Sequence, residues 1–245
     1  MITPAPPTPD GNLQGTLEEL LESGSTSNAA LNRLLDDYTT YHATLVVVGG
    51  CFLLALVLFT GFCWKQYRGS RASGAGTRTF ERRTYAGLGL LSVAVSALLA
   101  VVVAANLSNA LDARHGFSGV VTSLGSPPAS SSRAGLQLEF STWVQSGDAA
   151  TPSPIEDRIN DRLAWQQPKA LITGVLLVLI TAFSARAWRG LLWVSRVPAR
   201  PWAARDRFRL AVAIGSVPIC LLLMLMVIGN TQASVAPLTM TMLFG

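Results

Sequence analysis

The sequence predicts an all-α integral membrane protein with four transmembrane helices, arranged as a tandem duplication of a two-helix unit with an extracytoplasmic helical cap. Half of the 245 residues are hydrophobic and 13% are charged, a composition typical of a polytopic membrane protein and unusual for a soluble domain. Two further observations predict the arrangement. Four long stretches carry no charged residue, and the second half of the chain repeats features of the first.

The charge-free stretches predict the transmembrane helices. A helix of about 20 apolar residues crosses a hydrocarbon core of about 30 Å. The stretches are residues 38–64, 84–111, 170–185 and 210–245. They predict transmembrane helices at residues 43–63, 85–105, 170–188 and 210–229. The third is flanked by Lys169 and Arg186, whose long side chains reach the two membrane interfaces.

The duplication is indicated by polar, glycine and tryptophan residues that recur 123 to 128 positions apart. Examples are Gln14 and Gln137, Gly24 and Gly147, Asn32 and Asn160, Trp64 and Trp188, and Asn106 and Asn230. Apolar segments align by chance, but residues of these types do not recur in register by chance. Two repeats of one structural unit are therefore predicted.

The repeats divide the chain into five parts. Residues 1–10 contain four prolines and predict a disordered tail. Repeat 1 covers residues 11–110 and repeat 2 covers residues 135–236. An external connector, residues 111–134, joins them and includes a low-complexity run at 126–132, and residues 237–245 form an external tail. Each repeat is expected to contain a short external helix, a Ser-Gly break, an external helix that continues into the membrane, a basic turn and a returning helix.

Local signals refine the external helices. Thr16 followed by two acids resembles the start of the first helix, and Ser27 or Asn28 is expected to cap the second. Residues 136–144 alternate as a strand would, but their match to repeat 1 predicts a helix. Pro168 predicts a kink at the membrane entrance, and Pro218 predicts one in the fourth transmembrane helix.

Basic residues predict the orientation. Residues 64–83 hold six bases against one acid, Glu81, and residues 186–209 hold seven against one acid, Asp206. The positive-inside rule therefore places the turns at 64–84 and 189–209 in the cytoplasm and both termini outside. No basic segment precedes the first apolar run, so no cleaved signal peptide is expected. Arginine outnumbers lysine seventeen to two, which favours a bacterial plasma (inner) membrane protein.

The residues that could carry chemistry are few. No nucleophile motif, phosphate loop or dinucleotide fingerprint occurs, and no charged or histidine side chain lies deep in a predicted span, which argues against an ion-coupled transporter. The three cysteines lie in the predicted helices and are read as packing residues. We therefore expect no enzyme activity, cofactor or metal site. The net charge of +5 follows from the basic turns and gives no support for nucleic-acid binding.

Three groups of residues are candidates for interaction. A stripe of small residues is expected to pack against another helix, more often of this chain than of another subunit; it comprises Ser92, Ser96, Ala100 and Ala104, with Ala211 and Gly215 in the fourth transmembrane helix. Trp64 and Trp188 are expected to anchor the inner membrane interface. Tyr38, Tyr41, Trp143 and Trp165 are expected near an external partner or ligand surface.

These features favour a non-enzymatic accessory or scaffold subunit of a bacterial cell-envelope complex. Its expected partners are a membrane protein or a second copy, with anionic lipid head groups at the basic turns. One alternative is a channel or lipid-transport component whose path is lined by Thr60, Ser92, Ser184 and Ser216, although these hydroxyls can also bond to their own helices. The other is an extracytoplasmic ligand sensor that lacks its own output domain.

Overall fold

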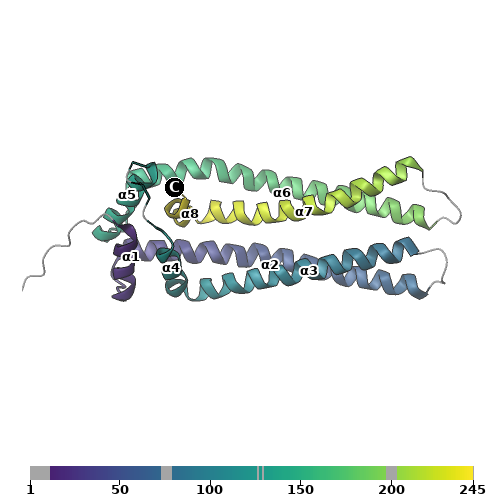
Figure 1. Cartoon of the computed structure of the whole chain (residues 1–245), viewed down its shortest axis with the longest axis horizontal. Helices are drawn as coiled ribbons and strands as arrows, with labels where there is room; N and C mark the ends of the chain where they lie inside the picture. The colour runs from purple at the N-terminus through teal and green to yellow at the C-terminus, as the bar shows by residue number, and fades with distance from the viewer. Residues whose placement is uncertain (1–11, 73–78, 126, 129, 197–202, 245) are drawn as a thin grey trace, which may run out of the picture. The chain divides into compact units, whose positions relative to one another are not determined.

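The structure, a computed structural model, describes residues 12–72, 79–125, 127–128, 130–196 and 203–244. The predicted disordered tail at 1–10 lies outside the described residues, as do parts of the two basic turns. Within the described residues the chain forms eight α-helices and no strand (Figure 1). The helices are α1 (Leu13–Glu22), α2 (Ala29–Ala72), α3 (Thr79–Leu111), α4 (Ala113–Thr122), α5 (Ser132–Ser146), α6 (Ser153–Ser195), α7 (Ala204–Val235) and α8 (Pro237–Phe244).

The helices follow one order twice, short, long, long, short. The first four contain 10, 44, 33 and 10 residues, and the last four contain 15, 43, 32 and 8. The chain also separates into two compact units. α2 and α6, the first long helix of each set of four, pass from one unit into the other. We name them the short-helix unit (residues up to 43, 107–165 and from 232) and the long-helix unit (44–106 and 166–231).

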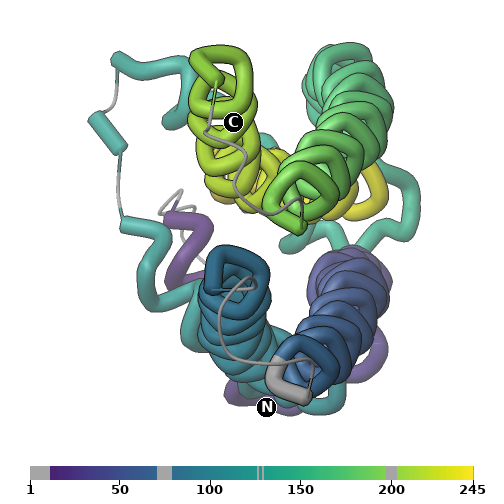
Figure 2. The backbone as a smooth tube through the Cα atoms, turned by 90° about the vertical axis from the view of Figure 1, so that its right-hand side faces the viewer, coloured from purple at the N-terminus to yellow at the C-terminus, as the bar shows by residue number. Residues whose placement is uncertain are grey.

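The long-helix unit identifies the chain as a multi-pass membrane protein. α2, α3, α6 and α7 are each long and apolar enough to cross a membrane. They form two hairpins, α2 with α3 and α6 with α7 (Figure 2). Large apolar side chains such as Leu98, Leu171 and Val178 are exposed along these helices. Such a surface is stable in contact with lipid tails and unstable in contact with water.

Two apolar clusters hold the hairpins of the long-helix unit together. In one, Leu45 and Leu99 from the first hairpin contact Met224 and Ile228 from the second. In the other, Cys63 and Tyr85 pack with Leu192 of α6. Each cluster therefore combines residues from both halves of the sequence.

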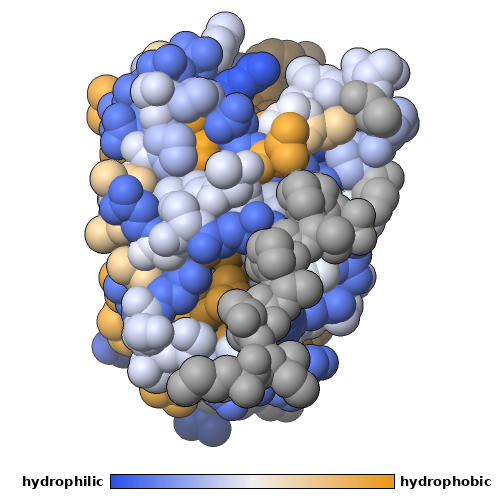
Figure 3. Space-filling model, turned by 90° about the vertical axis from the view of Figure 1, so that its left-hand side faces the viewer, coloured by the Kyte–Doolittle hydropathy of each residue, from blue (hydrophilic) through white to orange (hydrophobic). Residues whose placement is uncertain are grey.

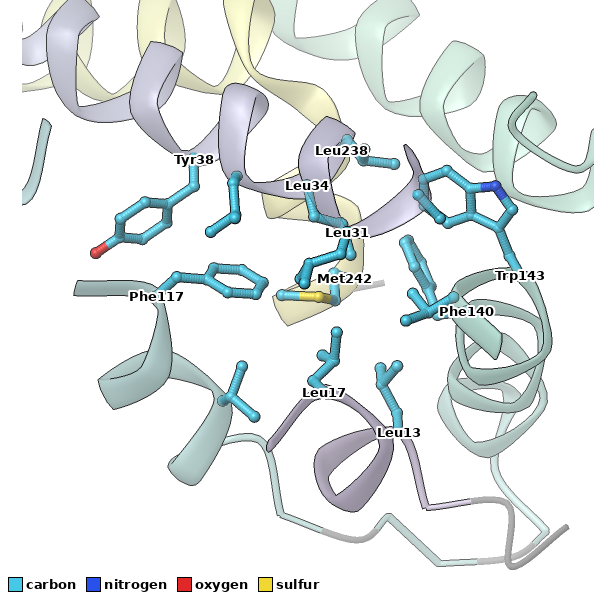
Figure 4. Close-up of a cluster of buried hydrophobic side chains, with 14 of the residues drawn as sticks. Leu13, Leu17, Leu31, Leu34, Tyr38, Phe117, Phe140, Trp143, Leu238 and Met242 are labelled. Carbon is cyan, nitrogen blue, oxygen red and sulfur yellow. The ribbon is translucent and has the colours of Figure 1, made fainter. Parts of the chain in front are cut away.

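The short-helix unit has a larger core of its own (Figure 4). Leu13 and Leu17 of α1, Phe117 of α4 and Phe140 of α5 are fully buried and point toward one another. Met242 of α8 joins them. At about 25 cal/mol per Å² of buried apolar area, side chains of this size supply most of the stability of such a unit.

The local predictions have mixed outcomes. The helix predicted at 136–144 is confirmed by α5. Asn28 caps α2, since its Oδ1 accepts from Leu31 N at 2.8 Å. The predicted start at Thr16 is wrong: α1 begins one turn earlier, because Asn12 accepts from Gln14 N at 3.1 Å. α6 continues through Pro168 as one helix.

Two helices lie where the sequence analysis assigned none. α4 occupies part of the connector at 111–134, and α8 occupies most of the tail at 237–245. Asp112 provides the cap of α4 by accepting from His115 N at 3.2 Å. Both helices are too short to be stable alone, so their contacts with the short-helix core must hold them.

Candidate functional site

The short-helix unit draws its core from both halves of the chain. α1 packs against α4 and α5, and α5 packs against α8. The buried apolar positions Leu17 and Phe140 lie 123 residues apart in the sequence, and their side chains meet in one core. Gly24 and Gly147, also 123 residues apart, end α1 and α5 with φ of +65° and +67°, a conformation that glycine adopts without strain.

Polar contacts join α2 to the end of α5. Asn28 Nδ2 donates to the carbonyl of Val144 at 2.8 Å, and Arg33 donates to the carbonyl of Ala149 at 2.9 Å. Asn28 therefore caps its own helix and also satisfies a carbonyl at the C-terminus of α5. A residue that serves both helices fixes the distance between the two halves within this unit.

The last helix, α8, is bound at both ends by side chains from elsewhere in the unit. Asp37 of α2 accepts a hydrogen bond from Thr239 N at 2.7 Å, as an N-terminal cap would. Arg133 of α5 donates to the carbonyl of Leu243 at 3.1 Å. Burial raises the pKa of the Asp37 carboxyl, while its hydrogen bonds to Thr239 oppose that rise.

α4 is fixed by close approach to α2. A Cβ atom at Gly116 would lie 2.7 Å from the Tyr38 hydroxyl, so only glycine fits there. Tyr38 also packs edge-to-face on Phe117, with ring centroids 5.5 Å apart. Arg114 donates to the carbonyl of Ser25 at 2.7 Å. The chain of α4 is thereby held against the start of α2.

The aromatic residues predicted near an external surface separate into two kinds. Tyr38 and Trp143 are each 2% exposed and belong to the core, where Trp143 Nε1 donates to the carbonyl of Asp148. Their rings therefore line no open surface in this structure. Tyr41 is partly buried, whereas Trp165 on α6 is 70% exposed. Figure 3 shows a face of the molecule on which hydrophilic residues predominate, with hydrophobic atoms visible between them.

The predicted small-residue stripe is only partly buried. Ser92 is buried and donates to the carbonyl of Leu56 on α2 at 3.0 Å. Ser96 and Ala100 are partly buried, and Ala104 is exposed. Ala211 and Gly215 are exposed on α7, where Ala213 and Ser216 are the buried small residues. The role predicted for Ala211 and Gly215 stays a prediction.

Each hairpin contains a hydroxyl contact, and the residues of the two contacts lie at corresponding positions in the sequence. In the first, Thr60 and Ser92 both donate to the Leu56 carbonyl, at 2.9 and 3.0 Å. In the second, Ser184 and Ser216 lie 124 residues later and their hydroxyl oxygens are 2.7 Å apart. All four hydroxyls are thus engaged within their own hairpins.

Two glycines that the sequence analysis did not single out lie at close contacts between the helices of the first hairpin. A Cβ atom on Gly49 would lie 3.0 Å from Val103 Cγ2, and one on Gly89 would lie 3.4 Å from Cys63 Cβ. Glycine in an otherwise apolar helix was the available signal, because small residues let two membrane helices approach.

One ion pair joins the two hairpins. Arg196 Nη2 donates to Glu81 Oε1 at 2.6 Å, and its Nε donates to Oε2 at 3.3 Å. The Glu81 side chain is 3% exposed and that of Arg196 is 48% exposed. A bidentate arginine is the partner a buried carboxylate needs. The sequence signal was a single acid in each basic turn.

The predicted anchors differ in exposure. Trp64 is 56% exposed, and its ring stacks on Tyr67 with centroids 5.8 Å apart. Trp188 is partly buried, and its Nε1 has no hydrogen-bond partner among the described residues. Their role as membrane-interface anchors stays a prediction.

The described residues contain no group of side chains that could hold a metal ion. No three His, Cys, Asp or Glu side chains gather there as a metal site requires.

We find no match to this chain among models of known families, among curated proteins or among solved structures.

Proposed function

We propose that the chain is a tandem duplication and that its two halves are related by the order α1–α4 and α5–α8. Three observations support this. The helix lengths repeat in order, Gly24 and Gly147 share one unusual φ, and the hydroxyl contacts of Ser92 and Ser216 recur 124 residues apart. Each observation concerns a different level of structure, so chance agreement of all three is a poor alternative.

The proposed orientation places the short-helix unit outside a bacterial plasma membrane as a helical cap, with both basic turns in the cytoplasm. The charge counts carry this orientation, since thirteen of nineteen basic residues lie at residues 64–83 and 186–209, which contain the two turns and their inner ends. Both turns belong to the same side because α2 and α6 each start in the short-helix unit and end at a turn.

The proposed function is that of a non-enzymatic accessory or scaffold subunit of a cell-envelope membrane complex. The observation that carries it is the short-helix core, to which both halves contribute buried side chains. A chain with two repeats that interlock presents one rigid surface, which is what a binding subunit requires. Trp165, an exposed aromatic residue of this unit, is the type of side chain that anchors protein interfaces.

The alternatives receive less support from the contacts. A channel or lipid-transport path needs hydroxyls free to face it, whereas Thr60, Ser92, Ser184 and Ser216 bond within their hairpins. A ligand sensor that uses Tyr38 and Trp143 would need an opening beside them, but both rings fill the core. Ion or lipid flux through liposomes that contain the purified protein would favour the first alternative.

The test is affinity purification from native membranes in a mild detergent, followed by mass spectrometry of the bound proteins. We expect one membrane protein to be retained in a stoichiometric amount. Trp165→Ala should reduce its retention at least about tenfold, as interface aromatic residues do. Trp193→Ala is the matched control, because Trp193 is 67% exposed and lies on the same helix outside the short-helix unit. A protein that purifies alone in several detergents would contradict the proposal.

A further inference from the structure

The first basic turn carries a cluster of two arginines and two aromatic rings with a defined geometry. We name Trp64, Tyr67, Arg68 and Arg82 the arginine-aromatic cluster. The rings of Trp64 and Tyr67 stack with an interplanar angle of 25°. The guanidinium carbon of Arg68 lies 5.2 Å from the Trp64 ring centroid, and that of Arg82 lies 5.6 Å from the Tyr67 ring centroid. The cluster therefore joins the end of α2 to the start of α3.

Stacking restricts the two arginines without using their hydrogen-bond donors. A guanidinium over an aromatic face is attracted by the ring, while its N–H groups point outward from its edge. Both arginines are exposed, so these donors can reach an external acceptor. A phosphate accepts such N–H groups in pairs, at a geometry that arginine matches better than lysine.

No carboxylate of either turn is available to neutralise the cluster. Residues 64–83 and 186–209 hold thirteen bases and two acids, Glu81 and Asp206. Glu81 is bound by Arg196, and both acids are only 2% exposed. Neither acid of the turns is therefore exposed beside Arg68 and Arg82, and an external anion can bind there.

The surface next to the cluster indicates which anion fits. Leu58, Phe59 and Phe62 precede Trp64 on α2 and are exposed, and the rings of Phe59 and Phe62 stack with centroids 6.5 Å apart. An apolar strip thus ends at a half-exposed indole; Arg68 follows it within one helical turn, and Arg82 of α3 lies over the neighbouring Tyr67 ring. A ligand with an anionic head group and an apolar chain would cover both parts, whereas a free phosphate would cover one.

The described residues of the second hairpin, which leave out 197–202, show no such arrangement. The residues 124 positions after Tyr67 and Arg68 are Leu191 and Leu192, which are buried. Trp188 keeps the position of Trp64, but the described residues place no arginine over its ring. The cluster therefore distinguishes the first hairpin from the second, which a general property of basic turns would not do.

We propose that the arginine-aromatic cluster binds the head group of an anionic phospholipid, whose acyl chain lies along Leu58, Phe59 and Phe62. The inference is independent of the proposed protein partner. It assigns to the first hairpin a specific lipid site in addition to the diffuse attraction of basic turns for anionic membranes.

The test is native mass spectrometry of the delipidated full-length protein, titrated with phosphatidylglycerol or phosphatidylcholine. We expect a single tight phosphatidylglycerol site with at least about tenfold preference over phosphatidylcholine. Each basic group near the head group adds to the free energy of binding a lipid with net negative charge. Arg68→Gln with Arg82→Gln should abolish that preference. The control is Arg205→Gln with Arg209→Gln in the second turn, which removes the same charge and should leave the tight site intact.

Three results would overturn the proposal. An equal loss in the control pair would mean that net charge alone attracts the lipid. Displacement of phosphatidylglycerol by millimolar inorganic phosphate would mean that the site takes a free anion. Full retention in the Gln pair would mean that the lipid lies elsewhere. If the Gln pair does not fold, Arg68→Lys with Arg82→Lys keeps the charge and should still weaken phosphatidylglycerol binding, because lysine lacks the planar group that pairs with a phosphate; unchanged binding would contradict the proposed site.

Discussion

The two halves of the chain hold their last short helix in different ways. In the first half, α4 starts with its own cap, Asp112, which accepts from His115 N. In the second, the residue before α8 is Ala236, which has no side-chain acceptor, and Asp37 of the first half accepts from Thr239 N instead. The N-terminus of α4 is therefore capped from within its own half, whereas that of α8 depends on the other half.

This difference shows that the two halves of the chain depend on each other within the short-helix unit. The contacts of Asn28 and Arg33 in the short-helix unit also connect one half to the other. In the long-helix unit, Arg196 and Glu81 do the same. If each half were autonomous, removing one of these groups would affect its own half alone, so variants can separate the two cases.

The largest effect is expected in the shared core. Phe140→Ala should lower the free energy of unfolding by about 3 to 5 kcal/mol and Leu17→Ala by about 2 to 5 kcal/mol, because each leaves a cavity at a fully buried position. Hydrogen exchange followed by mass spectrometry should show faster exchange in both α1 and α5 for either variant. Leu138→Ala, at an exposed position of α5, should change little. Faster exchange confined to the mutated helix would indicate independent halves.

The ion pair between the hairpins should have the next largest effect. Arg196→Ala leaves the buried Glu81 carboxylate without its partner and should cost on the order of 2 kcal/mol, less than a fully buried pair because Arg196 is half-exposed. Thermal unfolding in detergent measures this loss. Arg196→Ala with Glu81→Gln should recover part of it, since the charge that was stranded is then absent. Equal loss in the single and double variants would show that the arginine contributes through packing.

The cap that Asp37 supplies should contribute less. Asp37→Ala should destabilise α8 by about 1 kcal/mol, whereas Asp37→Asn keeps an acceptor for Thr239 N and should cost little. Hydrogen exchange of residues 237–244 reports on the cap directly. Asp112→Ala is the matched change in the first half and should affect α4 alone.

The same carboxyl predicts a pH dependence. The pKa of Asp37 is raised in the folded protein, so the stability it contributes is complete below its ordinary pKa of 3.8 and falls as pH rises through the folded value. Asp37→Asn should therefore gain stability relative to the wild type as pH increases through that window. Unfolding midpoints measured from pH 4 to pH 7 test this. If the stability gained by Asp37→Asn over the wild type shrinks with rising pH, the hydrogen bonds to Thr239 lower the pKa of Asp37 by more than burial raises it.

The smallest effect is expected at the hairpin hydroxyls. Ser92→Ala and Ser216→Ala should each cost about 0.6 kcal/mol, the typical value for a side-chain hydrogen bond between membrane helices. Similar losses in both variants would support equivalent roles in the two hairpins. A loss in one variant alone would show that the hydroxyl contacts differ between the two hairpins, as the caps of α4 and α8 do.

The sequence predicted the four long helices well because length and the absence of charge define a membrane helix almost completely. It also predicted the breaks at Gly24 and Gly147, where only a residue that tolerates positive φ ends the helix without strain. For the cap of α2 the sequence predicted Ser27 or Asn28, and the structure uses Asn28. These features depend on local chemistry, which a sequence records.

The short helices α4 and α8 were missed because contacts made elsewhere hold them. α8 has Ala236 at its start, and its cap comes from Asp37, about 200 residues earlier in the chain. The close approach at Gly116 depends on Tyr38, which no local pattern reveals. For the same reason, Tyr38 and Trp143 were expected near a surface, although the neighbours that bury them come from distant segments.

The most direct test of the proposed arrangement is the accessibility of single cysteines in intact cells. Cys51, Cys63 and Cys220 would first be replaced, and cysteines then introduced at Thr26 and Ala149 in the short-helix unit and at Arg83 and Arg207 near the turns, all exposed positions. A membrane-impermeant thiol reagent should label positions 26 and 149 from outside, and positions 83 and 207 only after permeabilisation. Labelling of 26 and 149 from opposite sides would contradict the parallel duplication, and labelling of 83 and 207 from outside would contradict an external short-helix unit.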